Sequence, residues 1–241
     1  MASTSTRYIR GALAYYGAHR MRLLDAFGEN VQKFELKPEM AGQHKGATGT
    51  DPRGWTPTVV EVGTGTSEAE ASDEAGIAWE LVSAANEDDG ISLQKFGETF
   101  QPDGERDIYF GVKLEADEAT QLDFLFGLAI TDTALLGGLS DGIYFEKLDA
   151  GTGISGVTEK DSGETQTDDL HTFAANTPVI LEFYYDGAQD RVYFFVDGLE
   201  VAIHTAGIPD DEALRISMEL LAGSAAARRL KIHWMRCIQI S

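Results

Sequence analysis

Short apolar runs bounded by turn residues fill the chain from residue 76 onward. They are mostly five to nine residues long, rich in Ile, Val, Phe and Tyr, and separated by Gly, Asp and Asn. Runs of this length and composition are typical of β-strands. The predicted strands cover residues 77–82, 91–96, 108–114, 122–130, 143–148, 179–185, 192–196, 199–203, 214–221 and 230–240.

The run at 108–114 alternates between two faces. Ile108, Phe110, Val112 and Leu114 fall on one side, and Lys113 falls on the other. Because successive side chains of a strand point to opposite faces, this run predicts a strand with one face in the core. The run at 192–196 is apolar on both faces, so we expect an interior strand that is covered on each side.

Two turn sequences join the predicted strands at 179–203 into a meander. Asp197-Gly198 separates two of them, and Asp-Gly is favoured where both central turn residues need a positive φ. A second turn, from Asp186 to Asp190, precedes it. Ten strands without a sustained helical period predict an all-β protein, in which two antiparallel sheets pack as a β-sandwich of the jelly-roll type.

The first 60 residues have a different texture and are expected to form an extended, mostly irregular N-terminal arm. Glycines and prolines interrupt any regular period, yet Tyr, Leu, Phe and Trp residues are scattered among them. These anchors fit two arrangements: the arm packs on the core of its own chain, or it holds on to another protein. Residues 61–76 contain five acids and no base, which predicts a solvated linker before a sandwich domain at 77–241.

Charge also divides the chain, and it excludes several partners. The 241 residues carry 19 Lys and Arg against 40 Asp and Glu, a net charge of −21. Residues 1–54 hold eight basic and five acidic groups, so the rest of the chain carries −24. This field repels phosphate backbones and anionic lipid surfaces, and we therefore expect no nucleic-acid and no membrane partner. The single cysteine, Cys237, excludes an intramolecular disulfide.

Patterns typical of catalysis are missing from the sequence. The five histidines are scattered without an HExxH pair, and no P-loop occurs. Five acids lie inside predicted strands, but none belongs to the paired ExDxxE arrangement of sandwich-type glycoside hydrolases. These acids, expected to be solvated charges on an outer face, are Glu80, Asp123, Glu146, Glu182 and Glu219. The sequence therefore predicts a protein that binds and does not catalyse.

Three acid pairs in predicted loops offer oxygen ligands of the kind that calcium prefers. They are Asp88-Asp89, Asp168-Asp169 and Asp210-Asp211, and none has the alternate spacing of a dedicated calcium loop. We therefore expect no metal and no other cofactor.

The predicted meander resembles the concanavalin A-like superfamily, in which a VDG turn followed by a short apolar strand recurs in laminin-G-type modules. Its sequence is TPVILEFYYDGAQDRVYFFVDGLEVAIHT. A longer set of segments resembles virion proteins of tailed phages, and it includes FLFGLAITDTALLGGLSDGIYFEKLDAG, IPDDEAL and AARRLKIHWMRCIQI. The resemblance covers residues 76–241 and implies a capsid-associated protein that decorates or cements the head. Carbohydrate-binding relatives share the same scaffold.

Two functions follow as hypotheses. The first is a non-enzymatic structural protein of a phage virion, soluble in the host cytoplasm before it binds the capsid exterior. Its expected partners are the major capsid protein and further copies of itself, with trimers at local three-fold axes as one arrangement. The residues expected to make this attachment are basic and aromatic residues of the arm: Arg7, Tyr8, Arg10, Tyr15, Tyr16, Arg20 and Arg22. The alternative is a lectin-like carbohydrate-binding module on a tail or fibre, which contacts host glycans.

Overall fold

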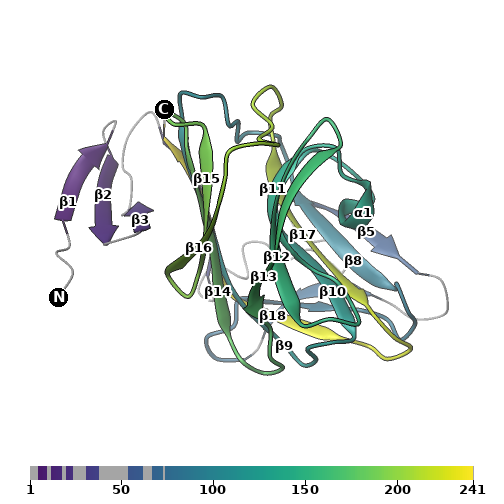
Figure 1. Ribbon diagram of the computed structural model, residues 1–241. Coiled ribbons are helices and arrows are strands. Elements are labelled where there is room, and N and C mark those ends of the chain that lie inside the picture. Colours follow the sequence, from purple (N-terminus) through teal and green to yellow (C-terminus); the bar gives the residue numbers. More distant parts are fainter. Residues whose placement is uncertain are drawn as a thin grey trace.

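Two antiparallel β-sheets face each other in the computed structural model of the protein (Figure 1). The structure describes residues 5–9, 12–17, 20–23, 31–37, 54–61, 67–72 and 74–240. Within these residues there are eighteen strands and one short helix, α1 (Leu135–Gly138). The predicted all-β sandwich is therefore confirmed.

One layer of the sandwich is a seven-stranded sheet. In spatial order it contains β13 (Gly163–Thr172), β12 (Gly153–Lys160), β11 (Gly142–Lys147), β10 (Leu122–Ala129), β17 (Arg215–Ala222), β8 (Gly90–Lys95) and β5 (Trp55–Val60). Helix α1 lies on the outer face of this sheet, away from the other layer (Figure 1).

The other layer is an eight-stranded sheet. Seven of its strands follow the spatial order β16 (Leu199–His204), β15 (Arg191–Val196), β14 (Val179–Asp186), β9 (Asp107–Ala116), β18 (Arg229–Ile240), β7 (Trp79–Val82) and β6 (Glu68–Ala71). The eighth, β4 (Val31–Leu36), pairs with the second half of β18, beyond the part that pairs with β7. A separate three-stranded sheet contains β1 (Ser5–Ile9), β2 (Ala12–Gly17) and β3 (Arg20–Leu23).

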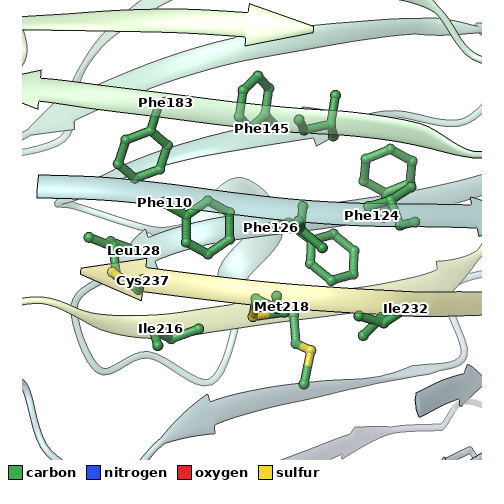
Figure 2. Packing of buried hydrophobic residues seen from close by; sticks show 14 of the residues in the cluster. Phe110, Phe124, Phe126, Leu128, Phe145, Phe183, Ile216, Met218, Ile232 and Cys237 are labelled. Atoms are coloured by element: carbon green, nitrogen blue, oxygen red, sulfur yellow. The ribbon is translucent and has the colours of Figure 1, made fainter. Parts of the chain in front are cut away.

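Aromatic rings fill the space between the two layers. Phe110 and Phe183 of the eight-stranded sheet stack with their ring centroids 5.2 Å apart (Figure 2). Phe194, from the same sheet, meets Phe145 of the seven-stranded sheet edge to face at 5.3 Å. Cys237 lies in this core as a buried free thiol. Removing this apolar surface from water is the main favourable contribution to folding.

Each of the ten predicted runs overlaps a strand of the sandwich. The alternating run in β9 places Ile108, Phe110, Val112 and Leu114 in the core, as expected. The meander is formed by β14, β15 and β16, and the hairpin turn between the last two has positive φ at Asp197 (47°) and at the following glycine (80°). The turn chemistry in the sequence is thus confirmed.

The sandwich also contains strands outside the expected domain at 77–241. β4 and β5 fall within the expected arm, and β6 falls within the expected linker. Trp55 of β5 is fully buried, with its ring centroid 5.7 Å from that of Trp79 in the opposite sheet. β4 pairs with β18, β5 pairs with β8 and β6 pairs with β7, so pairing with strands of the expected domain supplies the stability that their own composition does not.

Candidate functional site

The outer face of the seven-stranded sheet carries acidic side chains on neighbouring strands. In β10, Phe124 and Phe126 point into the core, so Asp123 and Leu125 point to the opposite face. The strand register places Leu125 beside Glu146 of β11 on one side and beside Glu219 of β17 on the other. β10, its sequence neighbour β11 and the distant β17 thus bring three carboxyl groups to one face.

Helix α1 and its flanking loops cover part of this face. Leu135 and Leu139 pack on Leu125, Tyr144 and other apolar residues in a second, smaller core cluster. The backbone N–H of Leu136 donates a hydrogen bond of 2.9 Å to Glu219 Oε2. Glu219 is therefore enclosed between the sheet and the helical segment.

A pocket of about 470 Å³ opens beside α1, and we call it the acidic pocket. This volume is within the range of small-molecule sites. The residues that line it are Asp88, Asp123, Leu136, Gly137, Gly138, Leu139, Tyr144, Glu146, Leu148, Asp149, Glu159, Glu164, Gln166 and Leu221. Six of them carry a carboxyl group, and among the lining residues in the described part of the chain none is Lys, Arg or His.

Hydrogen bonds orient several of these carboxyl groups. Tyr144 Oη donates to Glu159 Oε2 at 2.9 Å, and Gln166 Nε2 donates to Glu146 Oε1 at 3.1 Å. The backbone N–H of Asp149 donates to Asp123 Oδ1 at 2.6 Å. In each of these pairs the carboxylate is held by a fixed donor, which sets the direction in which its remaining lone pairs face.

Burial raises the pKa of three of the pocket carboxyl groups. The pKa of Glu146 is raised to about 7, mainly by desolvation and then by nearby carboxylates, of which Glu164 acts most strongly. Desolvation also raises the pKa of Asp123 to about 6 and that of Glu159. Glu219, under α1, has its pKa raised to about 7 for the same reason. Near neutral pH Glu146 and Glu219 therefore exchange between a proton-donating and an accepting form.

The prediction that the strand acids are solvated outer-face charges is wrong for four of the five. Asp123, Glu146, Glu182 and Glu219 are only 7 %, 8 %, 2 % and 2 % exposed. On the seven-stranded sheet, α1 and its flanking loops cover part of the outer face. Glu182 lies in β14 of the other sheet, where Tyr109 Oη donates to it at 2.7 Å. The fifth acid, Glu80, is partly exposed and pairs with Arg229 at 2.9 Å.

The residues predicted to attach the protein to a capsid cannot be placed at a site. Arg10 lies outside the described residues. The other six belong to the three-stranded sheet, in which the backbone alone is described: Arg7 and Tyr8 in β1, Tyr15 and Tyr16 in β2, and Arg20 and Arg22 in β3. Attachment through the arm, with the major capsid protein and further copies as partners, stays a prediction.

The described ranges contain no group of three or more His, Cys, Asp or Glu side chains that could hold a metal ion. Of the predicted acid pairs, Asp88 lines the acidic pocket and Asp168 accepts a hydrogen bond from Gln166 at 2.7 Å. Asp210 and Asp211 both pair with Lys160. In the same ranges no helix has the length and hydropathy to span a bilayer.

No protein-family model and no curated protein matches the sequence. Among solved structures, an endo-1,3-β-glucanase from Streptomyces sioyaensis aligns with 90 % of this chain and 99 % of its own, with a TM-score of 0.58 and 11 % identity. The carbohydrate recognition domain of Emp47p aligns with 85 % of this chain and 94 % of its own, with a TM-score of 0.56 and 16 % identity. At such identities the likeness shows the fold alone, which is a concanavalin A-like jelly roll.

Proposed function

We propose that this chain binds a carbohydrate in the acidic pocket and does so without turning it over. The observation that carries the proposal is the pocket itself, where oriented carboxyl groups from neighbouring strands face an open volume beside α1. Sugar hydroxyls donate hydrogen bonds, and carboxylates are strong acceptors for them. The solved structures of this fold include carbohydrate recognition domains and a glucanase, which supports a sugar as the ligand.

The walls of the pocket suit a ring with polar edges and apolar faces. Leu148 is exposed and lies at the pocket, and the apolar side chains of Leu136, Leu139 and Leu221 also line it. The polar residues of the lining outnumber these four leucines, so hydrogen bonds to the polar edges of the ligand fix its orientation, and the leucines offer apolar contact to its faces.

Replacing Glu146 by alanine is expected to weaken glycan binding about tenfold or more, since a buried acceptor of the ligand is lost. A glycan array with the purified protein identifies a ligand, and titration calorimetry then compares the variant with the wild type. Glu200→Ala is the matched control, because Glu200 is exposed on β16 in the other sheet. Equal affinity of all three proteins, or no glycan bound by the wild type, would contradict the proposal.

Glycoside hydrolysis is a second candidate, and the raised pKa values of Glu146 and Asp123 favour it. A carboxyl group with a pKa of about 7 is suited to donate a proton to a leaving oxygen, while a neighbour with a pKa of about 6 is mostly ionised at neutral pH. Incubation of the bound glycan with the protein, followed by a reducing-end assay, separates the two functions. New reducing ends that disappear in Glu146→Ala would establish hydrolysis, and their absence leaves binding alone.

The phage-virion hypothesis concerns where such a domain would work, and it rests on the resemblance of residues 76–241 to virion proteins. A sugar-binding sandwich and a capsid location are compatible, since the pocket lies on the seven-stranded sheet and the expected attachment residues lie in the arm.

A further inference from the structure

The acidic pocket combines strong negative charge with few positive partners. The two lysines closest in sequence to its lining residues make their hydrogen bonds or ion pairs with groups other than the pocket carboxylates. Lys147 is buried and donates to the backbone carbonyls of Leu122 at 2.7 Å and of Leu148 at 3.0 Å. Lys160 pairs with Asp210. The positive charge of Lys147 also acts on Asp123 and Asp149, whereas the charged groups that act most strongly on Glu146 and Glu159 are other carboxylates.

Two of the carboxyl groups also have unused hydrogen-bonding capacity. Asp123 and Glu146 are more than nine-tenths buried, and each accepts a single hydrogen bond, through Oδ1 and Oε1 respectively. Their other oxygens have no hydrogen-bond partner among the described residues. Neither oxygen is a fully buried atom without a partner, so each is open to a hydrogen bond from a ligand in the pocket.

The carboxyl groups are spread along the strands and are not gathered at one point. Glu146 lies opposite Ser155 of β12, whereas Glu159 lies four residues further along β12, which corresponds to about 13 Å. Glu159 in turn lies opposite Glu164 of β13. Negative charge is therefore distributed along the pocket, with Glu164 acting on both Glu146 and Glu159, which matches a ligand with more than one positive group.

Mutual repulsion disfavours the simultaneous ionisation of these groups. The carboxylate of Glu164 raises the pKa of Glu146, and it also raises that of Glu159. A bound cation reverses this effect, because an opposite charge within a few ångströms favours the ionised form of a carboxyl group. A neutral ligand supplies hydrogen-bond donors but leaves the repulsion in place.

We infer that the acidic pocket binds a cationic oligosaccharide, whose sugars carry free amino groups, in preference to the neutral oligosaccharide of the same linkage. This inference rests on the proposed carbohydrate binding and specifies its ligand class. The ammonium groups would contact Glu146, Glu159 and Glu164 along the pocket.

The test compares two ligands with the same sugar backbone and linkage: a glucosamine oligomer with free amino groups, which is cationic, and its fully N-acetylated counterpart, which is neutral. Calorimetry at neutral pH is expected to show binding of the amino form that is tighter by about tenfold for each ammonium–carboxylate contact. Glu146→Gln and Glu159→Gln should each weaken binding of the amino form by about tenfold, because each removes one ammonium–carboxylate contact. Glu200→Gln, which removes one charge from the opposite sheet, should leave the affinity for the amino form unchanged.

The outcomes separate the inference from the proposed function. Binding of the N-acetylated or another neutral glycan with equal or higher affinity would overturn the inference and leave carbohydrate binding intact. Failure to bind any glycan, charged or neutral, would overturn both. An oligolysine of equal charge tests general attraction to the acidic protein: if it binds as tightly as the amino sugar, and Glu146→Gln has no effect, the pocket is not the site.

Discussion

Replacing Phe194 by alanine is expected to lower the free energy of unfolding by about 3–5 kcal/mol, the usual cost of removing a buried aromatic ring. Phe194 is fully buried and joins the two layers, since its ring lies 5.3 Å from Phe145 and 6.2 Å from Phe183. It also meets the ring of His204 at 4.9 Å. Truncation leaves a cavity between the sheets that the surrounding strands fill only in part.

Urea denaturation followed by tryptophan fluorescence measures this loss. Phe96→Ala is the matched control, because Phe96 is 60 % exposed and its removal should change the stability by no more than about 0.5 kcal/mol. If the two variants lost similar stability, Phe194 would not hold the layers together in the way described here.

Replacing Glu219 by glutamine is expected to stabilise the protein at alkaline pH and to have little effect at acid pH. Burial raises the pKa of Glu219 from 4.5 to about 7 in the folded protein, so the native state binds the proton more tightly than the unfolded chain. Stability of the wild type should then fall as the pH rises from about 4 to about 7, and the full cost, about 3 kcal/mol, should persist above that range. Glutamine carries no charge and keeps an oxygen that can accept from the N–H of Leu136.

The measurement is the difference in unfolding free energy between Glu219→Gln and the wild type at pH 4, 6 and 8. Other titrating groups are shared by both proteins and cancel in this difference. Glu200→Gln, at an exposed position, should give a difference close to zero at all three values. If the difference in unfolding free energy between Glu219→Gln and the wild type stayed constant with pH, the raised pKa of Glu219 would be contradicted.

The strands at the centre of the sandwich could be predicted from the sequence, but the polar or short strands at the edges of its sheets could not. β10 is buried along its whole length, and its continuous apolar run is an unmistakable signal. β12 and β13 have no such apolar run. β13 lies at the edge of its sheet and is largely exposed, so most of its residues need not be apolar. The Thr, Asp and Glu side chains of β13 are largely hydrated, and the strand is held by its backbone pairing with β12. The short strands β4, β5 and β6 could not be recognised in the sequence for a related reason: few of their residues face the core, so they form no apolar run.

The candidate site could not be predicted, because it depends on strand register. Asp123, Glu146 and Glu219 stand alone in their own strands and form no motif. They share one face only because β11, β10 and β17 are neighbours in space, although β17 follows β11 by about 70 residues. Their burial depends further on α1, a four-residue element with Gly137 in the left-handed region at φ 76°. A period-two pattern gives the face of a side chain but not what covers that face.

The position of β18 has a consequence for how the polypeptide reaches its native state during synthesis. β18 pairs with β9 along nearly all of its length and, on its other side, with β7 and β4, so the middle of the eight-stranded sheet is incomplete until residue 240 has left the ribosome. Until then β9 and β7 present unpaired backbone edges on the nascent chain. Such non-local pairing slows folding and exposes intermediates to aggregation, and we expect the emerging chain to depend on chaperone protection over this interval.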